Sequence, residues 1–233
     1  MPISEIMKKH SIVIFLILPQ KIFSVYNIIM EKKISEKVIG RLTLYHCILD
    51  DYIKNNIEFI ASNQIASLLK IDDSQVRKDI SVLNTSGKSR SGYIVKEMKK
   101  AIEKTLGFAK TKNAFIIGAG NLGMALAKYD NFTNYGLNII ALFDNDSKKI
   151  GQSVNSKLIL DIEKLPNLCK KSGVDIAILT VPKEFAQSTA DFLIKANIKY
   201  IWNFAPVVLS VPSDVQVWNE NLMGNFLQFT YNI

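Results

Sequence analysis

Three glycines at the spacing G-x-G-x-x-G constrain this chain more than any other feature. Gly118, Gly120 and Gly123 follow the apolar residues 114–117 and precede a helical pattern of apolar residues, which is the order of strand, turn and helix in a dinucleotide site. The first glycine permits a tight turn, the second lets a pyrophosphate approach the backbone, and the third lets the helix pack closely on the strand. The N–H groups and the positive dipole end of that helix would face the phosphates.

An acidic residue stands where such a site needs one. A second apolar run, residues 137–143, ends in Asp144, 21 residues after Gly123. Its carboxylate can accept hydrogen bonds from an adenosine ribose and would repel a 2′-phosphate, which favours NAD(H) over NADP(H). Two alternatives stay open: Asp144 only caps the turn after its strand, or Lys148 and Lys149 allow NADP(H) to bind.

Strand and helix signals alternate through the second half of the chain. Continuous apolar strands with helical crossovers predict a parallel sheet covered on both faces, with ligands at the carboxyl ends of the strands. We therefore expect the turns at residues 180–182 and 203–206 to border the cofactor. The expected strands are 115–117, 138–143, 157–160, 175–181 and 200–204.

The excess of positive charge lies in the first half of the chain. Residues 1–112 hold 19 Lys and Arg against 11 Asp and Glu, whereas residues 113–233 hold 10 of each kind, so the net charge of +8 lies in the first half. A basic half beside a neutral nucleotide-binding half suggests that the first half meets a polyanion.

Helical periodicity in the basic half predicts a helix-turn-helix. A long amphipathic helix over 34–57 precedes a short helix over 63–69, capped by Ser62, and a second short helix over 75–83, opened by Ser74. The second short helix carries Gln75, Arg77 and Lys78 away from its apolar face, where they could reach base edges and phosphates. The alternative is an ordinary solvated basic face.

A basic glycine-containing stretch follows and favours the DNA-binding interpretation. Residues 84–95 contain Lys88 and Arg90 and return to the apolar residues 93–95, which predicts a basic hairpin, or wing. A wing beside a recognition helix would let one module hold the major groove and a flanking backbone or minor-groove track. The helix after the wing should close the small core with Ile102 and Leu106.

The remaining features exclude several classes. Cys47 and Cys169 lie in different halves, and neither they nor the isolated His10 and His46 have metal-ligand spacing, so we expect no disulfide framework, no metal and a cytoplasmic protein. The apolar run 12–18 is too short to cross a bilayer. We interpret residues 1–29 as an extension or a misassigned start.

The tail, residues 221–231, places five large apolar side chains on one helix. Such a helix has too much apolar surface to stand alone in water, and a second subunit could cover it. The side chains are Leu222, Met223, Phe226, Leu227 and Phe229.

Seven sequence motifs occur in order between residues 31 and 231: S-E-K-V-I-G-R-L, Q-V-R-K-D-I-S, the glycine wing ending in G-Y, G-A-G-N-L-G-x-A-L, F-D-N-D, the T-V-P turn and N-F-A-P-V-x-L-x-V-P. With these motifs the chain resembles the Rex family of redox-sensing transcriptional repressors. The resemblance implies a homodimer with a winged helix that binds a palindromic operator, a Rossmann-like domain that binds NAD(H), and a C-terminal helix swapped between subunits. In that family NADH releases the repressor from DNA.

Site residues follow from the same resemblance. DNA contacts would be made by Gln75, Arg77, Lys78, Lys88 and Arg90. Cofactor contacts would be made by Gly118, Ala119, Gly120, Asn121, Leu122, Gly123, Asp144, Thr180, Val181, Pro182, Asn203, Ala205 and Leu222.

Three departures from the family pattern affect those expectations. The wing reads L-N-T-S-G-K-S-R-S-G-Y rather than the more regular family sequence, and Leu222 replaces a phenylalanine near the partner's nicotinamide. Asn221 replaces an aspartate that alternates between an arginine and a tyrosine, matched here by Arg41 and Tyr129. An amide at this position implies a weaker latch, and hence poorer discrimination between NADH and NAD.

We therefore expect an α/β protein with four segments: an extension (1–29), a winged-helix DNA-binding domain (30–110), a Rossmann-like NAD(H)-binding domain (111–212) and a C-terminal dimerisation helix (213–233). The expected function is NAD(H)-responsive repression, without catalysis. The alternative is a small NAD-dependent oxidoreductase or a CoA-type nucleotide binder with a basic appendage. That alternative is weakened because no histidine lies in residues 113–233 to serve as acid or base.

Overall fold

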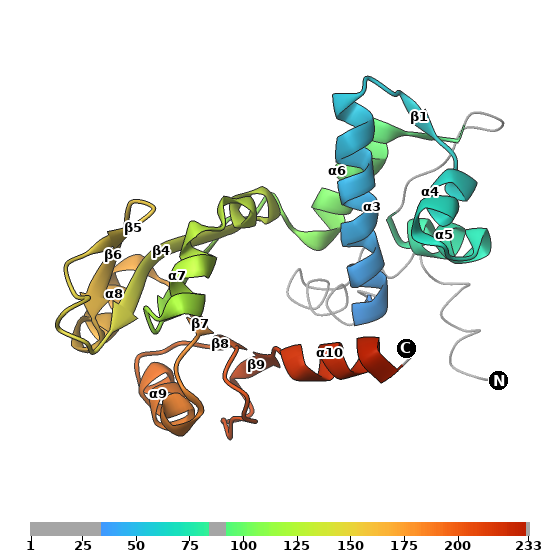
Figure 1. Cartoon of the computed structure of the whole chain (residues 1–233). Helices are drawn as coiled ribbons and strands as arrows, with labels where there is room; N and C mark the ends of the chain where they lie inside the picture. The colour runs from blue at the N-terminus through green and yellow to red at the C-terminus, as the bar shows by residue number, and fades with distance from the viewer. Residues whose placement is uncertain (1–33, 84–91, 232–233) are drawn as a thin grey trace, which may run out of the picture. The chain divides into compact units, whose positions relative to one another are not determined.

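The computed structural model describes residues 34–83 and 92–231. The chain divides between Ile102 and Glu103 into two compact units, which are described separately below (Figure 1). The first unit is mainly helical and contains a two-stranded sheet, whereas the second contains a seven-stranded sheet.

In its described residues, the first unit contains four α-helices and a short 3-10 helix. They are α3 (Glu36–Lys54), α4 (Ser62–Leu69), α5 (Asp73–Ile80), η2 (Ser81–Leu83) and α6 (Val95–Leu106), the last of which continues across the division. Each α-helix buries apolar side chains, including Leu42 of α3, Ile65 of α4, Val76 of α5 and Ile102 of α6. These side chains recur at helical spacing, so the amphipathic pattern determines which face of each helix packs inward.

Helices α4 and α5 form the expected helix-turn-helix, but both begin earlier than the sequence suggested. Ala61, not Ser62, occupies the position before α4, and its N–H donates to Oε1 of Gln64 at 2.8 Å. Asp72, not Ser74, caps α5 by accepting a hydrogen bond from the Ser74 N–H at 2.7 Å. A carboxylate satisfies a free helical N–H and favours the positive helix end, so the helix extends back to Asp73.

The strand that was expected to close the wing pairs elsewhere in the described chain. Strand β2 (Tyr93–Ile94) is antiparallel to β1 (Phe59–Ile60), which precedes α4. Gly92 makes this approach feasible because its φ is +81° and a Cβ there would lie 2.5 Å from the Ile60 carbonyl oxygen. Residues 84–91, which include Lys88 and Arg90, lie outside the described residues.

A mostly parallel sheet organises the second unit, in the order β5-β6-β4-β3-β7-β8-β9. The chain order reverses beside the first strand of the unit, β3, as in doubly wound folds, and only β5 is antiparallel to its neighbour. The strands are β3 (Lys112–Ile117), β4 (Leu137–Asp144), β5 (Ser153–Val154), β6 (Lys157–Asp161), β7 (Ile176–Leu179), β8 (Tyr200–Asn203) and β9 (Gln216–Asn219).

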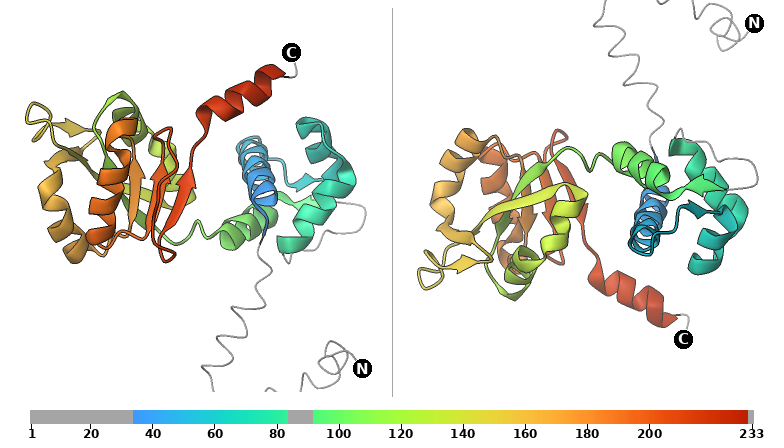
Figure 2. Two further views of the ribbon diagram at one scale, coloured as in Figure 1. Left: turned by 90° about the horizontal axis from the view of Figure 1, so that it is seen from below. Right: turned by 90° about the horizontal axis from the view of Figure 1, so that it is seen from above.

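Helices cover both faces of this sheet (Figures 1 and 2). Phe115 and Ile117 of β3 face a core that includes residues of α8 (Leu165–Ser172) and α9 (Lys183–Lys195). Ala114 and Ile116 face the opposite core, against α7 (Asn121–Lys128) and Phe132 of the 3-10 segment η3 (Asp130–Tyr135). Strand side chains alternate between faces, so a run of apolar residues supplies both cores.

The sheet extends further along the chain than expected. Strand β9 pairs in parallel with β8, so part of residues 213–233 belongs to the sheet and not to a terminal helix. The edge strand is short and largely exposed, and it lacks the continuous apolar run that marks a central strand. Helix α10 (Leu222–Tyr231) follows and buries none of its residues.

Across residues 34–83 and 92–231, we find no helix whose length and hydropathy would let it cross a membrane.

Candidate dinucleotide cavity and DNA-reading helix

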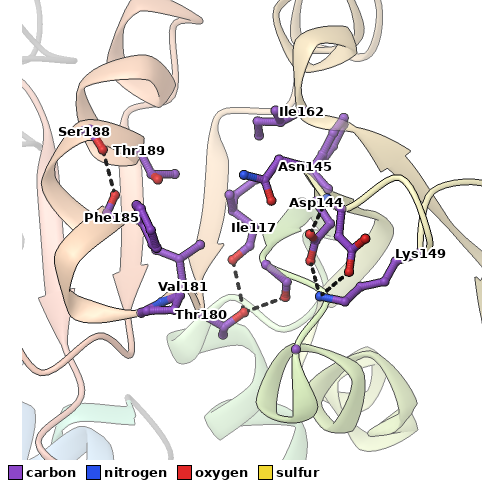
Figure 3. A pocket seen from close by; sticks show the side chains of 15 residues that line it. Ile117, Asp144, Asn145, Lys149, Ile162, Thr180, Val181, Phe185, Ser188 and Thr189 are labelled. Atoms are coloured by element: carbon purple, nitrogen blue, oxygen red, sulfur yellow. Dashed lines mark hydrogen bonds and ion pairs between the residues drawn. The ribbon is translucent and has the colours of Figure 1, made fainter.

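A cavity of about 540 Å³ lies at the carboxyl ends of β3, β4 and β7, next to the reversal in strand order. This is the position where open parallel sheets bind ligands. Side chains from the end of β3, from the loop after β4, from the turn after β7 and from α9 converge on it (Figure 3). The lining residues are Ile117, Gly118, Gly120, Phe143, Asp144, Asn145, Asp146, Lys149, Ile162, Thr180, Val181, Pro182, Phe185, Ser188 and Thr189.

The three glycines of the turn have different structural requirements. Gly118 has a φ of +100°, and a Cβ there would lie 2.8 Å from the Thr180 carbonyl oxygen. At Gly123 a Cβ would lie 2.0 Å from the carbonyl oxygen of Gly118, so this glycine allows α7 to pack against the turn. A Cβ on Gly120 would meet nothing within 4 Å. Packing therefore does not require glycine at 120, whereas a ligand approaching the backbone would.

Thr180 joins the end of β7 to this turn. Its hydroxyl lies 3.1 Å from the Ile117 carbonyl oxygen and 2.9 Å from that of Gly118 (Figure 3). The backbone N–H of Thr180 also donates to the Ile117 oxygen, at 2.8 Å. These bonds fix the distance between the end of β3 and the end of β7, which both border the cavity.

Asp144 ends β4 and is almost completely buried. Oδ2 accepts hydrogen bonds from the Ala119 N–H at 2.7 Å and from Nζ of Lys149 at 3.1 Å, and Oδ1 accepts one from the Asp146 N–H at 2.9 Å. Burial opposes ionisation, but the backbone N–H groups of Asp146 and Ala119, together with the Lys149 ammonium, outweigh it and lower the pKa of Asp144. Asp144 thus does more than cap its own turn, because it also ties the glycine turn to β4.

These contacts predict a pH-dependent effect of Asp144→Asn. We expect this substitution to reduce the free energy of unfolding by about 1–2 kcal/mol at pH 7, because an amide cannot accept all three bonds. A carboxyl whose pKa is lowered on folding stabilises the protein above its ordinary pKa and loses that contribution as the pH falls through the folded-state value. The difference between the two proteins should therefore narrow below pH 3.8, the ordinary value.

Tryptophan fluorescence during urea unfolding, from pH 7 to pH 3, measures this difference. Both tryptophans of the chain, Trp202 and Trp218, lie in β8 and β9, so the signal reports the sheet unit alone. A difference that stays constant down to pH 3 would contradict the assignment of the effect to the carboxylate.

The cavity includes some of the expected cofactor residues and not others. Gly118, Gly120, Asp144, Thr180, Val181 and Pro182 line it, while Ala119 contributes its N–H to Asp144. Gly123 packs beneath the turn, and Asn121 and Leu122 open α7. Leu222 lies on α10 with 58% of its surface exposed.

The turn after β8 is held together by its own hydrogen bonds. Asn203 is fully buried, and its amide donates to the Val207 carbonyl and to the Asn219 side chain at 2.8 Å each. Its Oδ1 accepts the Ala205 N–H at 3.0 Å. Asn203 therefore holds its own loop against β9, and neither Asn203 nor Ala205 belongs to the lining of the cavity.

The far wall of the cavity consists of residues that sequence reasoning did not select as cofactor contacts. Three of these residues directly follow β4, namely Asn145, Asp146 and Lys149, so their closeness to Asp144 in the sequence could have predicted them. Lys149 was considered only as a partner for NADP(H). No local motif marks the remaining four, which the fold brings from the end of β6 and from α9: Ile162, Phe185, Ser188 and Thr189.

Helix α5 presents two of its three expected DNA-reading side chains outward. Arg77 and Lys78 are exposed, and Arg77 forms an ion pair with Asp73 on the same helix. Gln75 is only partly exposed, because its Nε2 donates to Oδ1 of Asp79 at 2.8 Å.

The three residues expected to form the switch have other partners in the structure. Arg41 forms a two-pronged ion pair with Asp79 through Nε and Nη2, at 2.6 and 2.8 Å. Tyr129 stacks edge-on with Phe132, at a ring-centroid distance of 5.0 Å. Asn221 accepts the Gly224 N–H at 2.8 Å at the start of α10.

The described ranges 34–83 and 92–231 contain no group of three or more His, Cys, Asp or Glu side chains arranged to hold a metal ion.

Comparisons with known proteins cover both units. A family model described as a CoA binding domain matches residues 109–207, and one described as a putative DNA-binding protein N-terminus matches residues 33–81. The Redox-sensing transcriptional repressor Rex of Caldanaerobacter subterraneus subsp. tengcongensis is 39% identical over 206 residues, which are 88% of this chain and 92% of that protein. The Rex protein of Clostridium botulinum strain Hall is 41% identical over 200 residues, covering 86% and 95%.

Solved structures give the same result. The crystal structure of RSP with β-NAD+ and operator DNA is 37% identical with a TM-score of 0.79, covering 87% of this chain and 93% of that one. RSP with β-NADH is also 37% identical, with a TM-score of 0.77 and coverage of 87% and 95%. Fold and site together define the class of two-unit regulators in which a helix-turn-helix is joined to a Rossmann-like sheet. Within that class, the chain belongs to the Rex family of redox-sensing transcriptional repressors.

Proposed function

We propose that this protein binds operator DNA as a homodimer and is released from it when NADH occupies the cavity of the sheet unit. One observation carries the proposal: a single chain combines a helix-turn-helix whose α5 exposes Arg77 and Lys78 with a cavity built around Gly120 and Asp144. The homologous RSP has been crystallised with β-NAD+ and operator DNA and with β-NADH. A repressor of this kind acts on the chromosome, so we place it in the cytoplasm and assign it no catalytic reaction.

NAD(H) is the ligand that best suits the surroundings of Asp144. Three donors already occupy its two oxygens, which leaves room for a ribose hydroxyl on Oδ1, where a single N–H binds. The ionised carboxylate would repel a phosphate on the adenosine ribose. Lys149 is held by this carboxylate and lies 3.9 Å from Asp146, so its charge is largely compensated.

The exposed helix α10 supports a homodimer. Six of its side chains are large and apolar, and each exposes more than half of its surface: Leu222, Met223, Phe226, Leu227, Phe229 and Tyr231. An isolated chain would leave this surface in water, whereas a second copy would bury it. We therefore propose that α10 packs against the partner subunit, as the swapped helix of the family implies.

A dimer would place two recognition helices in successive major grooves, about 34 Å apart on one face of the DNA. NADH in the cavity would rotate one subunit relative to the other and so change the spacing of the recognition helices. The effect of NADH on operator affinity would equal the difference in NADH affinity between the two dimer states.

Fluorescence anisotropy on a two-fold symmetric, AT-rich duplex tests the proposal. We expect binding to fall steeply with salt, with a log-log slope of about −0.9 per neutralised phosphate, and NADH to release the duplex. A matched duplex with one half-site scrambled is the control for symmetry. If saturating NADH left the affinity for the duplex unchanged, this result would contradict the proposed regulation.

A CoA-type nucleotide binder is the second candidate, because the family model over residues 109–207 carries that description. CoA bears a 3′-phosphate on its ribose, which the Asp144 carboxylate would repel. Competition of CoA and NADPH against NADH distinguishes a CoA-type binder from an NAD(H) binder. We expect neither CoA nor NADPH to displace NADH efficiently. Turnover of NADH with carbonyl substrates would instead support the oxidoreductase alternative.

Asn221 provides a prediction about redox discrimination. Asn221→Asp should keep the cap on the Gly224 N–H, because an aspartate accepts the same bond and its charge suits a helix start. It would also replace an amide oxygen by a carboxylate in the latch, a gain of about 1 kcal/mol. We therefore expect the ratio of operator affinities with NAD and with NADH to increase about fivefold.

The measurement is a titration of each cofactor against the protein–operator complex, for the native chain and for Asn221→Asp. Asn225→Asp, which adds the same charge one turn later on α10, is the matched control. If the ratio of operator affinities with NAD and with NADH were equal in all three proteins, the residue at position 221 would have no part in redox discrimination.

A further inference from the structure

Asp79 is a buried carboxylate on α5, and both of its oxygens are fully occupied. Oδ2 accepts hydrogen bonds from Arg41 Nε at 2.6 Å and from the Tyr45 hydroxyl at 2.7 Å. Oδ1 accepts them from Arg41 Nη2 and from Gln75 Nε2, at 2.8 Å each. Only 1% of the Asp79 surface is exposed, so the exposed edge of the recognition helix is connected to the interior of the unit through this side chain.

The charges around Asp79 keep it ionised. Burial opposes ionisation, but the hydrogen bonds from Arg41, Tyr45 and Gln75 outweigh it and lower the pKa of Asp79. Burial, followed by the bond to Asp79, raises the pKa of Tyr45, so its hydroxyl remains a donor at neutral pH. Asp79 therefore offers only acceptor atoms to its neighbours.

An acceptor-only partner determines the orientation of the Gln75 amide. The nitrogen must face Asp79, which leaves Oε1 and the second N–H of Nε2 for other partners. Adenine presents a matching pair in the major groove, because its N6 amino group donates and its N7 accepts. With the opposite orientation, Gln75 would present its NH2 group outward and its oxygen would face the carboxylate.

We propose that Asp79 is a positioning residue for operator recognition, which holds the Gln75 amide in the orientation that reads adenine. Arg41 and Tyr45 keep the carboxylate in place from α3, and Asp79 itself does not touch the DNA. The proposal rests on the DNA-binding function proposed above. It assigns the sequence preference at one base pair to a residue in the interior of the unit.

The test begins with a duplex selected by the native full-length chain from a randomised pool, followed by single base-pair substitutions. The position whose preference disappears in Gln75→Ala is the one that Gln75 reads, and we expect it to be an A·T pair. Asp79→Asn should lower discrimination at that position by about tenfold, within the range of a two-pronged base contact. Discrimination at other positions and affinity for a non-specific duplex should change by no more than about twofold, since phosphate contacts supply non-specific binding.

Asp73→Asn is the matched control, because it removes the same charge from α5 but pairs with Arg77 and not with Gln75. The double substitution separates positioning from general destabilisation. In a Gln75→Ala background, Asp79→Asn should cause no further loss of base discrimination at that position. Thermal melting reports folding of each variant. If Asp79→Asn does not fold, Asp79→Glu keeps the charge beside Arg41 and displaces the oxygens by one methylene, so the same loss is expected.

Unchanged discrimination in a folded Asp79 variant would overturn the proposal, as would an equal loss with and without Gln75. Failure of the native chain to select any duplex would instead overturn the proposed DNA-binding function, on which this inference depends.

Discussion

Gly120→Ala should leave the protein folded but weaken NADH binding by at least about 100-fold. The added Cβ would meet no protein atom within 4 Å, so the substitution introduces no clash in the free protein. It would project where a pyrophosphate must approach the backbone, and the loss of one or two hydrogen bonds to a charged group, about 1.5–3 kcal/mol each, accounts for the effect. Isothermal titration calorimetry measures the affinity, and the variant should remain on operator DNA at NADH concentrations that release the native protein.

Gly123→Ala is the matched comparison for this prediction. Its Cβ would lie 2.0 Å from the Gly118 carbonyl oxygen and 2.8 Å from the Thr180 hydroxyl, so backbone must move and the melting temperature should fall. If Gly120→Ala bound NADH as tightly as the native chain, the pyrophosphate would not cross this turn. If it melted like Gly123→Ala, a Cβ at position 120 would clash with the protein after all.

Replacing Phe226 and Phe229 by aspartate should convert the proposed dimer to monomers and reduce operator affinity by at least about 100-fold. Both side chains expose more than half of their surface in the single chain, so charging them costs the isolated chain little. In a dimer the same change would bury two unpaired charges per subunit, which is strongly unfavourable. Linked half-site binding commonly gains 10²–10⁴-fold, roughly the advantage that a monomer would lose.

Light scattering after size exclusion and anisotropy on the two-half-site duplex measure the two effects. Asn225→Asp with Gln228→Asp is the control, because it adds the same two charges at polar positions of α10. NADH binding should persist at least weakly in both variants, since the cavity belongs to another part of the sheet unit. A Phe226→Asp, Phe229→Asp protein that stays dimeric would exclude α10 as the dimer contact.

The parts predicted well from the sequence are those set by local spacing. The turn from Gly118 to Gly123 requires particular backbone geometry at fixed positions, and Asp144 follows its strand directly, so a one-dimensional pattern contains the information. The helix-turn-helix was also found, although Asp72 moved the start of α5 because a carboxylate competes better than Ser74 for a free helical N–H. Strand β9 was missed because an exposed edge strand has no apolar run.

Gln75 shows where that reasoning stops. Helical periodicity places it on the exposed side of α5, and composition suggests a free DNA-reading side chain. Only folding brings Arg41 and Tyr45 of α3 to the same carboxylate, 34 to 38 residues away in the chain, and thereby draws the Gln75 amide inward. The far wall of the cavity arises in the same way, since Phe185 and Ser188 reach it from α9.

The sequence by itself determined the alternation of strands and helices, the glycine turn after β3, the acidic residue at the end of β4 and the excess of positive charge in the first half, because each depends on neighbours along the chain. Tertiary structure alone decided which polar side chains remain free and which are held. Hydrogen-bond partners such as Arg41 for Asp79, or Asn219 for Asn203, come from other segments of the chain, and most buried polar groups have such a partner.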